Sequence, residues 1–201
     1  MPSNDKLDLF KTHKKEYAAR AKPALLTIGP VRCLAIEGRG EPGGTQFQSK
    51  VGALYAAAYA IKFTSKAAGR DFVVCKLEAT WWSDQGDLAD CPQSDWQWAL
   101  MIRMPDFISG ADLHSAAQKV IAKGTCPEIS QVKLESLCEG LCVQALHLGP
   151  YDQESKTIEA MRSLASENGL AFQGRHHEIY LSDPRRVEPA RLRTILRQPV
   201  A

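Results

Sequence analysis

The sequence predicts an α+β fold of two tandem repeats, each reading strand, strand, helix, strand, strand, which are related by a pseudo-twofold axis, with antiparallel sheets around a central cleft. Three observations support this prediction. Apolar residues alternate with polar ones in several short runs, as in strands, and elsewhere they recur every three or four residues, as in helices. The order of these segments then returns in the second half of the chain. We therefore expect two units, each with a helix packed on a sheet.

The first repeat is expected to cover about residues 24–105, after a helical appendage over residues 1–22 that precedes a domain over 23–201. Its helix follows a glycine-rich break, because apolar side chains recur at helical spacing from Phe47 to Ile61. The elements expected in this repeat are strands over 24–28 and 31–37, the helix from Phe47 to a point before Gly69, and strands over 72–82 and 96–103.

A connecting helix over about 109–124 is expected to separate the repeats, because Ser109 is a good N-cap residue and Asp112 follows three residues later. The second repeat then covers about 131–201. Its expected elements are strands over 132–137 and 141–148, a helix capped by Asp152 that ends at Asn168, and strands over 171–181 and 194–198. On this correspondence Glu78 is equivalent to Glu178.

The composition is that of an ordinary globular protein, with 44% hydrophobic residues and a formal net charge of +2 over 201 residues. It excludes an acidic or basic disordered tail, a collagen-like chain and a membrane bundle. The longest apolar run is about half of the roughly 20 residues that a membrane helix needs, so no membrane partner is expected. An arginine-rich stretch near the C-terminus lacks any nucleic-acid-binding motif, so no nucleic-acid partner is expected either.

The chain is expected to be cytoplasmic, because no secretory signal follows the first charged residues. Its six cysteines include no Cys-x-x-Cys pair, and they are expected to be reduced. The neighbours His176 and His177 do not predict a metal site, since adjacent residues of a strand point to opposite faces. Neither a metal nor a cofactor is expected.

Two glutamates are the candidate catalytic or cation-binding residues. In the run 72–82 the apolar side chains suit the helix-covered face, which leaves Glu78 on the opposite one. The same alternation leaves Glu178 with His176 and Tyr180. Two carboxylates from equivalent strands are therefore expected to converge in the cleft, a setting for general-base catalysis or for binding a cation. The alternative is that both are solvated strand residues.

Aromatic residues gather beside Glu78, because all four tryptophans lie between Trp81 and Trp98. Trp81 is assigned to the core, whereas Trp82 shares the face of Glu78. Such a group of rings around a carboxylate is typical of a pocket for a flat or cationic organic molecule. Tyr55, at the margin of the first helix's apolar stripe, either completes the core or reaches the cleft. The ligand-binding candidates are Trp82, Trp96, Trp98, His176 and Tyr180.

With these residues in place, the chain resembles a stand-alone member of the GyrI-like small-molecule-binding family. The segments that carry the resemblance are 25–28, 35–40, 54–55, 77–82, 98–103, 147–151 and 176–184. Members of this family include effector domains of multidrug-responsive regulators, an inhibitor of DNA gyrase, and enzymes that hydrolyse the cyclopropane ring of DNA-alkylating antibiotics. The segments around the tryptophans and around His176 are most similar to the hydrolase branch.

The resemblance implies tandem strand-helix-strand-strand repeats around a central ligand cleft. It also implies a hydrolase that removes planar electrophilic xenobiotics. It implies Glu178 as the carboxylate that directs water, with Glu78 as a partner and Tyr55 polarising a carbonyl group. Trp82, Trp98 and Tyr180 would stack on the ligand. Two alternatives remain open: a non-catalytic module that sequesters hydrophobic, aromatic or cationic molecules, and a gyrase-inhibitor-like interaction protein. The oligomeric state is also left open.

Overall fold

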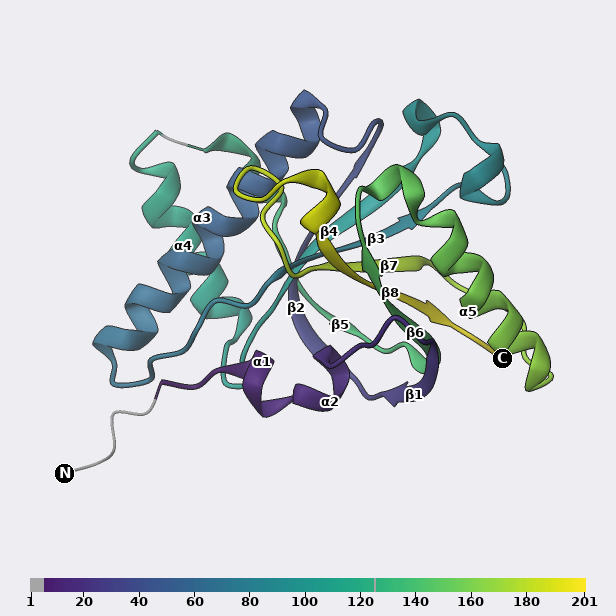
Figure 1. The fold of residues 1–201 in the computed structure, drawn as a ribbon. Helices are drawn as coiled ribbons and strands as arrows, with labels where there is room; N and C mark the ends of the chain where they lie inside the picture. The colour runs from purple at the N-terminus through teal and green to yellow at the C-terminus, as the bar shows by residue number, and fades with distance from the viewer. Residues whose placement is uncertain (1–5, 125) are drawn as a thin grey trace. The chain divides into compact units, whose positions relative to one another are not determined.

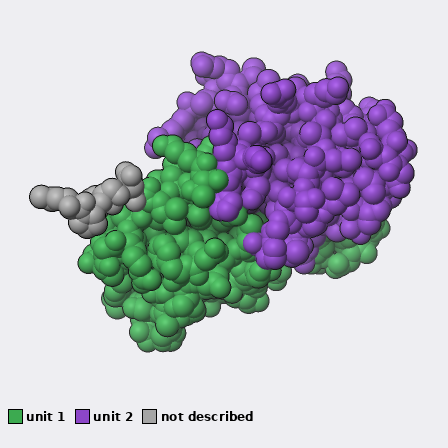
Figure 2. All heavy atoms as spheres, turned by 90° about the horizontal axis from the view of Figure 1, so that it is seen from below, with its two compact units in different colours: residues 1–12, 31–75, 81–137 green, residues 13–30, 76–80, 138–201 purple. Residues whose placement is uncertain are grey.

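The computed structural model describes residues 6–124 and 126–201, so the first five residues of the expected appendage lie outside it. These residues divide into two compact units (Figure 2). Unit 1 comprises the described residues of 1–12, 31–75 and 81–137. Unit 2 comprises residues 13–30, 76–80 and 138–201. Neither unit is continuous in sequence, and the expected repeat boundaries stay a prediction.

Unit 1 is an antiparallel sheet covered by helices (Figure 1). Its sheet has the order β3-β4-β2-β5, where only the end of β3 belongs to this unit. The elements of unit 1 are α1 (Leu9–Thr12), β2 (Val31–Arg39), α3 (Thr45–Ala67), the end of β3 (Leu77–Trp82), η1 (Leu88–Asp90), η2 (Gln93–Asp95), β4 (Gln97–Arg103), α4 (Gly110–Ile121), η3 (Pro127–Gln131) and β5 (Lys133–Leu137).

Unit 2 is built in the same way, with one long helix against an antiparallel sheet of order β1-β6-β8-β7-β3 (Figure 1). The beginning of β3 forms its last strand. The elements of unit 2 are α2 (Lys14–Tyr17), β1 (Ala24–Ile28), the start of β3, β6 (Gly140–Leu148), η4 (Tyr151–Gln153), α5 (Ser155–Glu167), β7 (His176–Tyr180), η5 (Pro189–Arg191) and β8 (Arg193–Pro199).

The helices lie where the apolar periodicity predicts them. In α3 the small residues Ala53, Ala57 and Ala58 are fully buried, and the helix packs on β2 and β4. In α4 the expected cap is present, because the Ser109 side chain accepts from the Asp112 backbone while the Asp112 carboxylate accepts from the Ser109 backbone. These local signals suffice to place both helices.

The hydrophobic core of unit 2 lies between α5 and the strands β6 and β8. Val143, Ala145, Met161, Ala165 and Leu196 are each no more than 1% exposed. The sequence predicts 194–198 as a final short strand; in the structure β8 lies between β6 and β7, with five consecutive buried residues. The last strand of the chain therefore forms the middle of this sheet.

The outer strands are exchanged between the two halves of the sequence. The early strand β1 pairs with β6, so that Leu26 lies opposite Cys142. The later strand β5 pairs with β2, so that Cys33 lies opposite Glu135. Each compact unit thus takes one strand from the other half of the chain, which explains why its residues are discontinuous.

Several expected elements are shorter than predicted. The run 72–82 is a strand only from Leu77, and the run 171–181 only from His176 to Tyr180. The expected N-terminal helix consists of two separate turns, α1 and α2, and Tyr17 of α2 is only 6% exposed. No helix among the described residues is long and apolar enough to span a membrane.

Trp98 fills the space beside a glycine in unit 1. It lies opposite Gly38 in the β2–β4 pairing and is fully buried, with its indole N–H donating to the Gly40 carbonyl oxygen at 3.1 Å. A Cβ atom at Gly38 would lie 2.2 Å from the Trp98 ring. The ring of Phe47 meets Trp98 edge-on at 5.1 Å between centroids. Gly38 is therefore required for this ring to occupy its position.

We expect Gly38→Ala to destabilise the protein by about 1–3 kcal/mol, because the added methyl group overlaps a ring that has no room to move. Urea unfolding followed by circular dichroism measures this loss. Gly52→Ala on α3 is the control, since nothing lies within 4 Å of its added Cβ atom. Equal stability of the two variants would contradict the packing described for Trp98.

Candidate active site

The predicted site residues are divided between the two units. Unit 1 holds Tyr55, Trp82, Trp96 and Trp98, whereas unit 2 holds Glu78, His176, Glu178 and Tyr180. Within unit 2 the structure brings together the three residues on one face of β7, together with a carboxyl group that the sequence analysis did not single out. The neighbours of each side chain fix what it can do.

The expectation that Trp98 stacks on a ligand is wrong. This side chain is 0% exposed and packs on Phe47 and Gly38, so no ligand reaches its face without unfolding β4. Trp96 is half-buried; its N–H donates to the carbonyl oxygens of Leu88 and Cys91, and its ring meets Trp81 edge-on at 5.8 Å. Trp81 lies in the core, as predicted.

Tyr55 and Trp82 are both half-buried, so their predicted roles stay predictions. Tyr55 continues into a row of rings along α3. Its ring stacks on Tyr59 at 6.2 Å, and Tyr59 stacks on Phe63 at the same distance. The spacing of four residues places all three on one side of the helix.

Glu78 does not converge with Glu178. Its Oε2 lies 3.1 Å from His177 Nε2, and its Oε1 accepts a hydrogen bond from the Tyr17 hydroxyl at 3.1 Å. Because His177 and Glu178 are neighbours on β7, their side chains point to opposite faces of the strand. Glu78 therefore shares the face of His177, where it is 3% exposed. The expected pairing of Glu78 with Glu178 is wrong.

Glu78 belongs to a buried network of four charged groups. His177 Nδ1 lies 2.9 Å from Glu139 Oε1, and Arg197 donates to Glu139 Oε2 at 2.9 Å. Both ring nitrogens of His177 face carboxylates, so both are donors and the ring is an imidazolium. The network then carries two negative and two positive charges, and it also receives the Tyr17 hydroxyl. Balanced charge and satisfied hydrogen bonds make it a structural feature of unit 2.

The pKa values follow from this arrangement. Burial acts to lower the pKa of His177, but the Glu139 and Glu78 carboxylates outweigh it and raise the pKa to about 9. Burial acts to raise the pKa of Glu139, but His177 and Arg197 outweigh it and lower the pKa to about 2. Each charge is maintained by the opposite charge beside it.

The free energy of unfolding should therefore be highest between pH 4.5 and 6.5 and should fall at lower and at higher pH. Because the pKa of His177 rises from 6.5 to about 9 on folding, its contribution is complete below pH 6.5 and is lost as the pH rises through 9, by about 3 kcal/mol. The contribution of Glu139 is complete above pH 4.5 and is lost as the pH falls towards 2.

The expected loss of stability at alkaline pH is measured by urea unfolding of the wild type and of His177→Gln between about pH 5 and 10, a range that includes the titration of His177. We expect the wild type to lose stability between pH 6.5 and 9 and the variant to lose much less. Parallel curves for the two proteins would show that His177 is not the titrating group.

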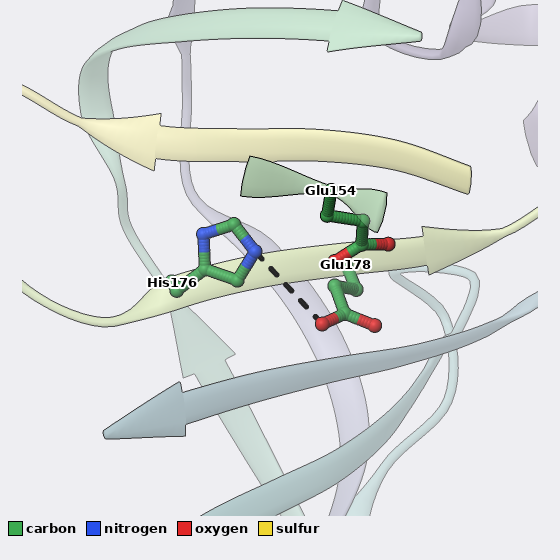
Figure 3. Close-up of side chains that lie close together, drawn as sticks. All are labelled: Glu154, His176 and Glu178. Atoms are coloured by element: carbon green, nitrogen blue, oxygen red, sulfur yellow. Dashed lines mark ion pairs between the residues drawn. The ribbon is translucent and has the colours of Figure 1, made fainter. Parts of the chain in front are cut away.

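The opposite face of β7 carries Glu178 between His176 and Tyr180. All three are half-buried, as the strand alternation predicts, while His177 and Ile179 point into the core. His176 Nε2 lies 3.8 Å from Glu178 Oε1 (Figure 3). The Tyr180 hydroxyl donates a hydrogen bond to Glu178. The strand therefore presents one carboxylate with an imidazole on one side and a phenol on the other.

Glu154 completes this group, although nothing in its sequence neighbourhood predicts it. Donor atoms of Glu154, His176 and Glu178 all lie within 4.8 Å of one another (Figure 3). Glu154 is 8% exposed, and its Oε1 has no hydrogen-bond partner among the described residues. The helix α5 begins one residue later than Glu154, so the expected cap, Asp152, lies instead in the turn η4.

The turn before α5 fixes the position of Glu154. Gly149 adopts a φ of +128°, which side chains rarely allow, and so lets the chain leave β6 sharply. His147 Nε2 lies 3.1 Å from the Pro150 carbonyl oxygen and therefore donates to it. Its Nδ1 then accepts from the Thr157 hydroxyl at 3.0 Å. The buried His147 thus ties both ends of this turn to β6.

Three acidic groups of the site, Tyr151, Glu154 and Tyr180, hold their protons strongly. Burial, and then the neighbouring Glu178 charge, raise the pKa of Glu154 to about 9. Burial also raises the pKa of Tyr151 to about 12 and that of Tyr180 well above 10. The two phenol rings meet edge-on at 6.0 Å. Near neutral pH the site therefore offers one carboxylate, Glu178, beside groups that donate protons.

A divalent metal ion is another occupant for a set of two carboxyl groups and an imidazole. An ion would first have to displace the proton of Glu154, since ligands bind in their deprotonated form. The arrangement fits acid–base chemistry better, and no step below involves a metal.

A buried carboxyl group beside two phenol rings is a combination of groups found in sites for small organic molecules. Residues 21–201 match the family model described as the GyrI-like small molecule binding domain, and the chain belongs to this family. No curated protein matches the chain.

Solved structures agree with this assignment. An uncharacterized conserved protein from Listeria innocua is 38% identical, with a TM-score of 0.91, and the match covers 98% of this chain and 100% of that one. A hydrolase from Listeria innocua is 37% identical, with a TM-score of 0.88 and the same coverage. The EcmrR C-terminal domain is 14% identical, with a TM-score of 0.57 over 89% of this chain and 96% of that one, and shares the fold.

Proposed function

We propose that this GyrI-like protein hydrolyses planar electrophilic compounds of the cyclopropanoid type, with Glu178 directing a water molecule to the strained ring. The observation that carries the proposal is the placement of Glu178. It is a largely buried carboxylate, hydrogen-bonded to Tyr180, beside a second carboxyl group that keeps its proton. A carboxylate beside a carboxyl group that keeps its proton supplies one base and one acid, which acid–base catalysis requires.

The reaction needs one base and one acid. Water forms a new C–O bond to a cyclopropane carbon, and the C–C bond that breaks sends its electron pair into the conjugated carbonyl group. Glu178 takes a proton from the attacking water. The carbonyl oxygen becomes a phenol oxygen and gains a proton, so the sum of the changes is the addition of one water molecule. Tyr151 and Tyr180 offer rings against which a flat substrate stacks.

The similar protein from Listeria innocua that is called a hydrolase supports this proposal, since it covers nearly the whole chain at 37% identity. Its name does not state a substrate. The choice of a cyclopropanoid substrate rests on the chemistry of the site and on the resemblance of the segments around Glu178.

The test is to incubate the protein with a cyclopropanoid electrophile and to follow the ring-opened product by chromatography. We expect several product molecules per protein molecule, at a rate proportional to protein concentration. Binding is followed separately by quenching of tryptophan fluorescence. Quenching without any product would refute the hydrolase.

A second candidate is a binding module that sequesters hydrophobic cations. The close pair Glu154 and Glu178 favours it, because a cation bound between them would displace the proton and pair with both carboxylates. This candidate predicts that a lipophilic cation binds more tightly as the pH rises, and that it is recovered unchanged.

A further inference from the structure

We propose that Glu154 and Glu178 are an acid–base pair that shares one proton, and that Glu154 is the acid which protonates the carbonyl oxygen of the substrate as the ring opens. This inference rests on the proposed function, and it replaces Glu78 by Glu154 as the second catalytic carboxyl group. Three features of the site support it: the direction of the Glu154 side chain, the preference of the proton for one carboxyl group, and the return of the proton after the reaction.

The Glu154 side chain is directed into the site instead of to its own helix. Glu154 is the residue before α5, where an acidic side chain commonly accepts hydrogen bonds from the first N–H groups of the helix. It makes no such hydrogen bond. Figure 3 shows its carboxyl group beside that of Glu178, and the residue is more than nine-tenths buried. The Glu154 carboxyl group therefore does not stabilise the N-terminus of α5.

Of the two carboxyl groups, that of Glu178 has the surroundings that stabilise the ionised form better. It accepts a hydrogen bond from Tyr180, and His176 lies 3.8 Å from it. The Oε1 atom of Glu154 has no hydrogen-bond partner within the part of the chain that the structure describes, and the neighbouring charge that acts on it is negative. A buried carboxyl group with an unpartnered oxygen and a negative charge beside it is favoured in its neutral form. The shared proton therefore belongs to Glu154.

The other groups around the pair do not change this assignment. The titratable side chains that face it are His176 and Tyr180 from β7 and Tyr151 from η4, while Asp183 acts on Tyr151 from the loop after β7. The two phenols remain protonated, because their pKa values are raised. Asp183 is held as an anion by Arg185, which lowers its pKa to about 2. Asp183 acts on Tyr151, and the charge that acts on Glu154 is that of Glu178.

The proton balance of one turnover closes within the pair. Glu178 gains the proton that the attacking water loses, and Glu154 loses its proton to the carbonyl oxygen. The pair then holds one proton again, now on Glu178. Because the neutral form is favoured on Glu154, the proton returns from Glu178 to Glu154. The oxygen atoms of the two groups lie within 4.8 Å of one another, a separation that one bridging water molecule spans. No outside acid or base is required.

Infrared difference spectra of the full chain test the shared proton without any substrate. The wild type at pH 7 should show the C=O band of a protonated carboxyl group, which Glu154→Gln removes. Glu159→Gln, on the exposed side of α5, is the control and should remove an ionised carboxylate band instead. Absence of the protonated band from the wild type would overturn the inference, as would its persistence in Glu154→Gln.

Turnover tests the acid role. Glu154→Gln should lower kcat about 10²–10⁴-fold while fluorescence quenching shows unchanged binding, because glutamine fills the same space but cannot donate the proton. If the wild type shows the protonated band but Glu154→Gln keeps full activity, Glu154 is not the acid that protonates the substrate. If the wild type itself does not open the ring, the proposed function fails, and the band still decides whether the pair holds a proton.

Discussion

Glu178→Gln is expected to lower the rate of ring opening about 10²–10⁴-fold, because glutamine cannot take the proton of the attacking water. The substitution preserves the shape of the side chain and its contact with the Tyr180 hydroxyl. Binding, measured by tryptophan fluorescence, should therefore change much less than kcat. Loss of turnover with retained binding identifies Glu178 as a catalytic residue and not as part of the ligand's binding surface.

Two comparisons make this result specific. Glu159→Gln removes an exposed carboxylate from α5 and should leave the rate unchanged. Glu78→Gln should reduce stability more than it reduces kcat, since Glu78 contacts His177 and Tyr17 on the other face of β7. Equal turnover by the wild type and Glu178→Gln would refute the assignment of the base.

The second large effect is expected on stability. Glu139→Gln should cost about 3–5 kcal/mol, because it leaves His177 and Arg197 as buried positive charges without their shared partner. The side chain of Glu139 is only 3% exposed, so water does not replace the lost charge. Urea unfolding at pH 6 measures the change.

The control is Glu135→Gln, which neutralises an exposed carboxylate on β5. The double variant Glu139→Gln with His177→Gln should be more stable than the sum of the single changes predicts, because the two residues interact directly. Additive effects would show that Glu139 and His177 do not stabilise one another.

Sequence signals that lie within a few residues of one another predict their elements correctly. The capping box of Ser109 and Asp112 and the apolar spacing of α3 lie within a few residues, and both helices are present. The alternation along β7 also assigned Glu178 and Tyr180 to one face correctly. That strand has one fully buried face and one half-buried face, which is the condition under which alternation is informative.

Alternation along the strand did not separate buried from exposed residues in β3 and β4, because both faces of these strands are covered. Four consecutive residues of β3, from Glu78 to Trp81, are buried, and so are the last six of β4. The polar face of β3 is therefore not exposed to solvent. Glu78 can be buried there because His177 and Tyr17 form hydrogen bonds with its carboxylate. Trp98 is buried because Gly38 leaves room for it.

Glu154 and Glu139 were missed for a different reason. Glu139 lies 38 residues from His177 in sequence, and their contact depends on how the strands of unit 2 pair. Glu154 reaches Glu178 only because the turn at Gly149 and the hydrogen bonds of His147 direct the start of α5 towards β7. Neither contact leaves a pattern within a single element.

The most direct measurement is turnover of a cyclopropanoid electrophile in water labelled with ¹⁸O, with the product analysed by mass spectrometry. The account predicts many ring-opened molecules per protein molecule, each with one labelled oxygen on the carbon of the opened ring, and a rate that falls in Glu178→Gln. Recovery of the compound unchanged after binding, or a single equivalent attached covalently to the protein, would contradict it.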